Sequence, residues 1–141
     1  MATDEVQIRQ TTGRVGLRLH SPERGPGGKL AYFSADLLDP TIRASARVYA
    51  YYSEGLADVF DEMAREWRGW SGCKHWESLE GELKLSFTAD GKGHVTVAIQ
   101  LSQSLYPDSW RVQATSLIEA GQLDELANSM RQFLEQGGRA A

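Results

Sequence analysis

The sequence of 141 residues has a single cysteine, four prolines and no long apolar run. Cys73 has no partner within the chain, which excludes a disulfide framework and indicates a reducing compartment. A membrane span requires ~18 consecutive apolar residues. The polar start of the chain, residues 1–5, lacks the basic and apolar regions of a secretory signal. We therefore expect a cytoplasmic protein with no membrane partner.

Positive charge is also scarce, because 15 Lys and Arg residues face 19 Asp and Glu residues, for a net charge of −4. This balance is unfavourable for a protein that must neutralise phosphates. The main basic and aromatic grouping lies on one expected strand and comprises Arg43, Arg47, Tyr49 and Tyr51. An exposed sheet face carries such residues without binding bases, so we predict no nucleic-acid partner.

Metal-ligating residues are too few for a recognisable site. Cys73, His75 and His94 lack the second ligand pair that makes a zinc signature specific. The sequence Gly91-Lys92-Gly93 joins two expected strands, so no helix N-terminus lies behind it to bind phosphate. We predict no metal, no cofactor and no catalytic residue.

What is present is the composition of a folded domain, with 41% hydrophobic and 24% charged residues. A chain of this length can bury a core of its own, so residues 1–141 are expected to form a single domain. Two prolines and three glycines between Ser21 and Gly28 predict a loop that ends a strand. We expect residues 21–29 to be flexible and the tail 137–141 to be frayed.

The apolar pattern separates strands from helices. Alternation predicts strands near residues 6–8, 15–20, 30–36, 42–51, 83–88, 94–101 and 110–116. A period of 3.6 residues predicts helices from Ser53 to about Gly69 and from about Gly121 to Glu135. The predicted fold is α+β with element order ββββαβββα, an antiparallel sheet of about six to seven strands with two amphipathic helices packed on one face.

Three of the four tryptophans lie within residues 67–76. Such a cluster either closes the core between helix and sheet or lines a binding groove. Trp67 continues the apolar stripe of the first helix, which favours the core, and Trp70 is expected to be the more exposed. If the segment forms a groove, the residues expected to line a pocket are Trp70, His75, Trp76 and His94.

The acidity is concentrated after residue 50. Residues 1–50 hold seven basic and five acidic residues (+2), whereas residues 51–141 hold eight and fourteen (−6). Carboxylates on the polar face of the first helix and just after the tryptophans form the expected acidic surface: Asp58, Glu62, Glu66, Glu77 and Glu80. Solvation alone explains many acidic helices, and the alternative is a docking surface for a basic protein.

Several short motifs between residues 50 and 135 occur together: W-x-G-W-x-G from Trp67, W-x-S-x-E-x-x-L from Trp76 and G-H-V from Gly93. With this set the chain resembles a family of small uncharacterised bacterial proteins, classed as a domain of unknown function. The resemblance implies a shared fold and no established activity. A looser likeness, in size, acidity and architecture, is to immunity proteins that neutralise bacterial toxins.

We therefore expect a non-enzymatic cytoplasmic binding protein, of the immunity-inhibitor type, that docks a basic protein partner through its acidic surface. The alternative is a small-molecule or enzymatic pocket between the sheet and the Trp-rich segment. The chain is expected to be a monomer or a homodimer.

Overall fold

The computed structural model describes residues 4–103 and 106–135, which form eight strands and two α-helices. The first four strands are β1 (Glu5–Ile8), β2 (Gly16–Arg24), β3 (Leu30–Leu38) and β4 (Ala44–Tyr49), followed by α1 (Glu54–Arg65). The second group is β5 (Cys73–Glu77), β6 (Leu83–Ala89), β7 (His94–Ser102) and β8 (Arg111–Glu119), followed by α2 (Leu123–Glu135). Single 3-10 turns occupy Pro26–Gly28 and Ala120–Gln122.

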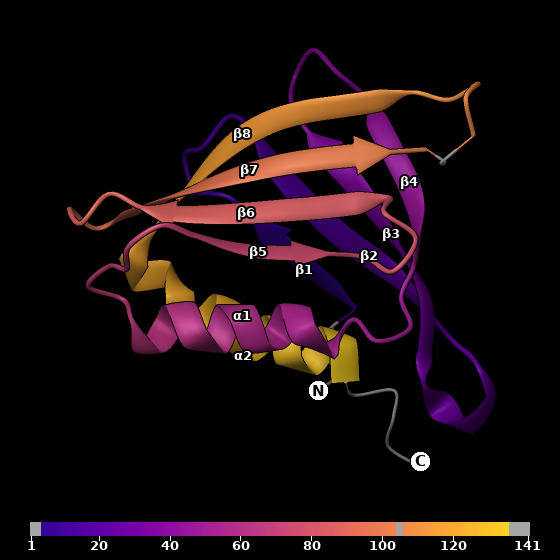
Figure 1. Ribbon diagram of the computed structural model, residues 1–141, viewed down its shortest axis with the longest axis horizontal. Coiled ribbons are helices and arrows are strands. Elements are labelled where there is room, and N and C mark those ends of the chain that lie inside the picture. The colour runs from indigo at the N-terminus through magenta and orange to yellow at the C-terminus, as the bar shows by residue number, and fades with distance from the viewer. Residues whose placement is uncertain (1–3, 104–105, 136–141) are drawn as a thin grey trace.

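The predicted single sheet of six to seven strands is wrong, because the strands form two separate four-stranded sheets. Each sheet is an antiparallel meander, with orders β1-β2-β3-β4 and β5-β6-β7-β8, and the strands of one run across those of the other (Figure 1). At the edge strand β4, the Tyr49 amide donates to the Glu82 carboxylate at 3.1 Å. The Glu82 side chain, from the β5–β6 turn, thus accepts from a backbone N–H that would otherwise be free to pair with a further strand.

Strand β5 was missing from the predicted order. It pairs with β6 over residues 73–77, and its side chains are alternately exposed and half-buried. The two inward positions hold Lys74 and Trp76, so a charged residue stands where alternation would place an apolar one. The observed order is therefore ββββαββββα.

Strand β2 continues beyond the predicted break at Ser21. It runs to Arg24 and includes Pro22, and its pairing with β3 shifts register between His20 and Glu23. A bulge accommodates a proline in a strand because it interrupts the ladder at that point. The predicted loop is thus confined to the connection after Arg24, and the tail 137–141 lies outside the described residues.

Both predicted helices and the tight turn after β6 are confirmed. The β6–β7 turn contains Gly91 and Gly93 at φ 73° and 93°, and the Asp90 carboxylate accepts the Lys92 and His94 amides at 2.6 and 3.1 Å. Ser53 stands at the start of α1 but makes no capping hydrogen bond through its side chain. In the part of the chain that the structure describes, no helix is long and apolar enough to cross a membrane.

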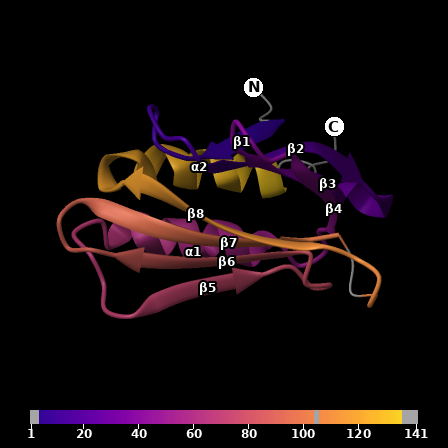
Figure 2. The same cartoon turned by 90° about the horizontal axis from the view of Figure 1, so that it is seen from above.

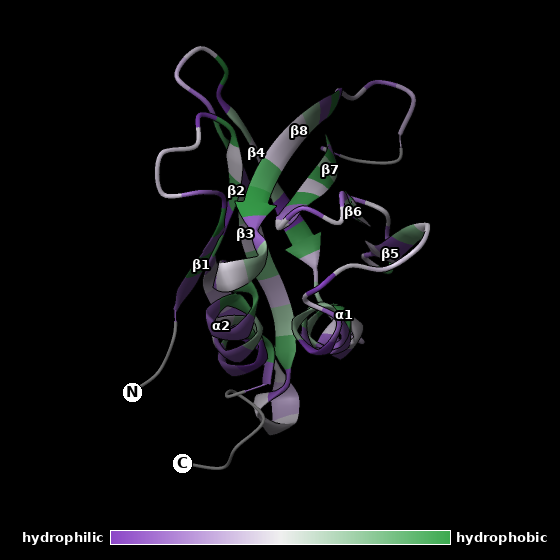
Figure 3. Cartoon of the chain, turned by 90° about the vertical axis from the view of Figure 1, so that its left-hand side faces the viewer, coloured by the Kyte–Doolittle hydropathy of each residue, from purple (hydrophilic) through white to green (hydrophobic). Residues whose placement is uncertain are grey.

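The helices lie side by side beneath the two sheets, as the end-on view of Figure 3 shows. The view from above in Figure 2 places α2 beneath the first sheet and α1 beneath the second. Phe60 of α1 contacts Phe87 of β6 edge to face, with ring centroids 5.3 Å apart. Phe133 of α2 contacts Phe33 of β3 in the same way at 5.7 Å. Each helix therefore packs on the sheet of the other half of the chain, and all four rings are fully buried.

Candidate functional site

Four tyrosines gather where the first sheet ends, and we call them the tyrosine surface: Tyr32, Tyr49, Tyr51 and Tyr52. The Tyr49 ring lies 5.5 Å from that of Tyr32 and 5.1 Å from that of Tyr51. Tyr32 is 37% exposed and Tyr52 is 79% exposed. Large aromatic side chains on rigid strands provide contact area at a small cost in conformational entropy, which suits them to protein recognition.

The alternation of β4 produces this surface. Ala46 and Val48 face the core, so Arg47 and Tyr49 face outward. Arg47 lies over the Tyr32 ring at 6.0 Å and is held by Glu23 at 2.9 Å. Because inward and outward side chains alternate along β4, the outer side of the first sheet carries a row of aromatic rings with Arg47 beside it.

Tyr52 occupies a conformation that tyrosine rarely adopts. Its φ of 65° lies in the left-handed region, in the short connection between β4 and α1. Such a conformation costs a residue other than glycine about 1–2 kcal/mol. A large side chain that is both strained and exposed is a reason to look for function here.

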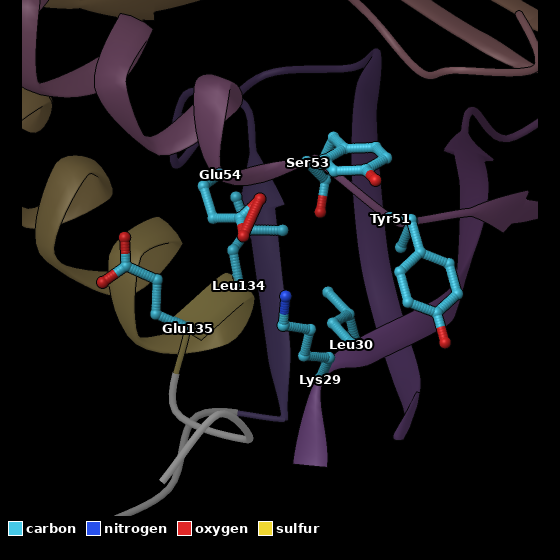
Figure 4. Close-up of a pocket in the computed structure, with 9 residues that line it drawn as sticks. Lys29, Leu30, Tyr51, Ser53, Glu54, Leu134 and Glu135 are labelled. Carbon is cyan, nitrogen blue, oxygen red and sulfur yellow. The ribbon is translucent and has the colours of Figure 1, made fainter. Parts of the chain in front are cut away.

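A pocket of about 370 Å³ adjoins the tyrosine surface (Figure 4). Its walls come from the start of β3, the β4–α1 connection and the end of α2. Tyr51 and Tyr52 belong to both the surface and the pocket, and Lys29, Glu54 and Glu135 supply charge. Leu30, Ala50 and Leu134 add an apolar floor. The pocket extends the aromatic row into a concave, partly charged end.

Carboxylates border the tyrosine surface. The pKa of Tyr49 is raised, first by partial burial of its hydroxyl and then by the neighbouring Tyr51, Tyr32, Glu80 and Tyr52. Glu80 is exposed, and in the described parts of the chain it forms no ion pair. Glu82 is fixed instead, because it accepts hydrogen bonds from the Tyr49 amide at 3.1 Å and the Ser78 hydroxyl at 2.8 Å. Both carboxylates carry negative charge at this border, and Glu80 is the exposed one.

Two cations of the same chain bind the expected acidic face of α1 and offset part of its charge. Asp58 lies 2.9 Å from Arg131 of α2, which also binds Asp61 and Glu135. Lys74 of β5 binds both Glu62 and Glu66, the latter at 3.2 Å. These pairs join α1 to α2 and to β5, and they reduce the charge that α1 offers to a partner.

The Lys74 pair makes a prediction about pH. The hydrogen bond from Lys74 lowers the pKa of Glu62. Because the folded-state pKa lies below the ordinary value of 4.5, the stabilisation is present above about pH 4.5 and is lost as the pH falls through the lowered folded value. We expect Lys74→Met to be less stable than wild type at pH 6 in urea denaturation, with a difference that shrinks towards pH 3.

Lys84→Met is the matched control, because Lys84 lies on the next strand and is 3.9 Å from Glu77. Its difference from wild type should be small at both pH values, since exposed ion pairs contribute little. A Lys74→Met difference that stays constant from pH 6 to pH 3 would show that the lysine stabilises the fold through packing alone.

The other two acidic candidates lie near β5. Glu77 ends β5, is exposed and is 3.9 Å from Lys84, whereas Glu80 occupies the β5–β6 turn. Of the five predicted carboxylates, the structure therefore brings Glu80 to the tyrosine surface. Asp58 and Glu62 of α1, and Glu66 just after its end, all lie in ion pairs.

The Trp-rich segment differs from its expected arrangement. Trp67 is 54% exposed and lies against Arg68, because α1 ends at Arg65 and the helical stripe does not reach it. Trp70 is half-buried against the core, donates to the Phe87 carbonyl at 3.3 Å and carries the Lys74 ammonium over its ring at 5.1 Å. Trp67 is thus the exposed residue and Trp70 the one packed against the core, the reverse of what the sequence indicates.

The four predicted pocket residues do not converge. Trp76 packs against the core from the inner side of β5, as Trp70 does from the preceding connection. His75 faces outward and lies 3.1 Å from the Ser86 hydroxyl, whereas His94 is exposed at the start of β7 and lies 3.0 Å from Asp90. Across residues 4–103 and 106–135, no group of three His, Cys, Asp or Glu residues could hold a metal ion.

Sequence reasoning found part of the tyrosine surface. It placed Tyr49 and Tyr51 on one strand face but assigned no role to Tyr32 or Tyr52. The outward position of Tyr32 is readable from the alternation of residues 30–36. Its closeness to Tyr49 depends on the β3–β4 register, which pairs the two residues directly.

Comparison with known proteins assigns the chain to a family. No curated protein matches the chain. The crystal structures of Trypanosoma brucei MRP1/MRP2 include a chain that is similar over 97% of this protein and 84% of its own length, with 15% sequence identity and a TM-score of 0.47. A family described as a family of unknown function, DUF6228, matches residues 8–137. The chain therefore belongs to the DUF6228 family, whose function is unknown.

Proposed function

We propose that this protein is a binding protein that docks a basic, arginine-bearing protein partner through the tyrosine surface. The observation that carries the proposal is the grouping of four tyrosines, two of them at least 37% exposed, beside Glu80, whose carboxylate has no ion pair among the described residues. Inhibition of a toxin, as by an immunity protein, would be one use of such a surface.

Arginine is the residue that best complements this arrangement. Its planar guanidinium stacks on aromatic faces and pairs with carboxylates. The protein already shows this geometry within itself, because Arg47 lies 6.0 Å from the Tyr32 ring centroid and pairs with Glu23. A partner arginine would find rings in Tyr49 and Tyr51 and a carboxylate in Glu80.

The pocket beside the surface extends the contact. Glu54 and Glu135 face Lys29 across a volume of about 370 Å³, and Glu135 is also bound by Arg131. Glu54 forms no ion pair within the described ranges, so it adds a second carboxylate for a cationic side chain. The polar face of α1 is a weaker candidate, since its carboxylates are bound to Arg131 and Lys74.

The test uses a synthetic nine-residue arginine peptide carrying a fluorophore, with the lysine peptide of equal length for comparison. We expect fluorescence anisotropy to show tighter binding of the arginine peptide, and Tyr49→Ala to weaken it at least about tenfold, as truncation of a hot-spot aromatic does. Glu80→Gln should weaken it less, with a reduced dependence on salt.

Tyr106→Ala is the matched control, because Tyr106 is 78% exposed and lies beyond β7 in the second half. It should bind like wild type. Equal affinities for the arginine and lysine peptides, or full binding by Tyr49→Ala, would contradict the proposed surface.

A further inference from the structure

A serine, a histidine and an aspartate lie in contact on the outer face of the first sheet. The Ser21 hydroxyl is 2.8 Å from Nδ1 of His20, and Nε2 of His20 is 2.9 Å from Oδ2 of Asp36. This contact does not have the alignment of a hydrogen bond, so the buried Nε2 has no hydrogen-bond partner among the described residues. We call these three residues the Ser21 cluster.

The bulge in β2 creates the cluster. In a regular strand two consecutive side chains point to opposite faces. The register shift after His20 and the φ of 51° at Ser21 turn the serine hydroxyl onto the histidine ring. Bulges beside active sites re-aim side chains in this way. Ser21 and Tyr52 are the non-glycine residues in the described ranges with positive φ, so backbone strain marks both candidate sites.

Asp36 is held in place as an anion. The Ser45 hydroxyl donates to Oδ1 at 2.6 Å, and Arg18 lies 3.3 Å from Oδ2. Partial burial raises the pKa of Asp36, but the hydrogen bond from Ser45 and the neighbouring His20 and Arg18 outweigh it, so the pKa lies below the ordinary value. A fixed carboxylate beside a histidine stabilises the imidazolium that forms when the ring accepts a proton.

The serine is accessible from solvent. A surface pocket of about 460 Å³ is lined by Arg18, His20, Ser21 and Pro22, with Asp4 and Glu5 at its border. Ser21 is exposed, and its backbone carbonyl is fixed by Arg47 at 2.8 Å. Arg18 is the cation of the pocket wall, and Glu5 orients it at 2.9 Å. The pocket carries both acidic and basic groups, which suits a small uncharged substrate.

We propose that Ser21 is a nucleophile for small uncharged carboxylic esters, with His20 as its general base. The Ser21 oxygen bonds to the ester carbonyl carbon while its proton passes to Nδ1 of His20, in the tautomer that leaves Nδ1 free. Arg18 stabilises the negative carbonyl oxygen. The carbon–oxygen ester bond then breaks, and the proton of His20 moves to the departing alkoxide. Water next bonds to the acyl carbon and gives a proton to His20; the bond between that carbon and the Ser21 oxygen breaks, the Ser21 oxygen takes the proton from His20, and the carboxylic acid leaves.

The test uses a fluorophosphonate probe, which forms a covalent bond with activated serines, and hydrolysis of p-nitrophenyl acetate. We expect wild type to be labelled at Ser21, Ser21→Ala to lose labelling, and His20→Gln to react at least about 100-fold more slowly. Ser86 is an internal control, because it lies 3.1 Å from His75 and no described carboxylate is within ion-pair distance of that ring. It should stay unlabelled.

Folding is monitored with two serine variants. Ser21→Gly should also lose labelling but melt a few degrees above Ser21→Ala, because glycine tolerates a φ of 51°. An unlabelled wild-type protein would overturn the proposal, as would a label that survives Ser21→Ala in a folded variant. Arginine-peptide binding is independent of these outcomes, since it is assigned to the tyrosine surface.

Discussion

Phe60→Ala is expected to lower the free energy of unfolding by about 3–5 kcal/mol, as truncation of a buried phenylalanine does. Phe60 is fully buried on α1 and contacts Phe87 of the second sheet at 5.3 Å. The alanine variant loses both the transferred apolar surface and the edge-to-face contact, and it leaves a cavity between helix and sheet. Equilibrium urea denaturation measures the change.

Phe133→Ala should cost a similar amount, because it removes the equivalent contact of α2 with Phe33. Val59→Ala is the matched control on α1, since Val59 is only partly buried against the core and should cost far less. A loss below about 1 kcal/mol for Phe60→Ala would contradict the packing of α1 against the second sheet.

Neither half of the chain is expected to fold alone. A fragment of residues 1–69 contains the first sheet and α1, but its α1 packs against β5 and β6 of the other half. A fragment of residues 70–141 has the complementary defect, because α2 packs against β1 and β3. Each fragment would expose the apolar faces of its sheet and its helix, and the conformational entropy of folding would not be offset.

Circular dichroism on heating tests this prediction. Each fragment alone should show no cooperative transition, whereas the mixed fragments should recover the strand and helix signal and one melting transition. We propose that the full chain forms a single domain, and it should therefore unfold in a single step. A cooperative transition in residues 1–69 alone would mean that the two halves are independent units.

Local patterns predicted most of the elements. Both helices and seven strands follow from the spacing of apolar residues, because one buried face imposes its period on the sequence. β5 did not, because Lys74 takes an inward position and pairs with Glu62 of α1 and with Glu66 just after that helix. That compensation comes from residues twelve and eight positions earlier in the chain, and no local pattern shows it.

The division into two sheets could not be predicted for a related reason. Strand periodicity states which residues face inward but not which strands are neighbours. The contact that ends the first sheet is between the Tyr49 amide and the Glu82 carboxylate, 33 residues apart. The exchange of helices between halves likewise depends on pairs such as Phe33 and Phe133.

Site residues that lie close together in the sequence could be predicted, whereas those brought together by the fold could not. Tyr49 and Tyr51 were visible as outward residues of one expected strand, whereas their neighbours Tyr32 and Glu80 come from another strand and a turn. Ser21 was assigned to a loop because Pro22 and the following glycines suggest one. A strand that contains a bulge and a proline has the same composition as a loop, so the Ser21 cluster requires the structure.

The central claim is that a basic partner is recognised at the tyrosine surface and not at the acidic face of α1. NMR titration of the ¹⁵N-labelled protein with the nine-residue arginine peptide tests it most directly. We predict that amide shifts concentrate at residues 49–54 and at Glu80, and that Tyr49→Ala abolishes them. Shifts that concentrate instead at Asp58, Glu62 and Glu66, or no shifts at all, would contradict the proposed surface.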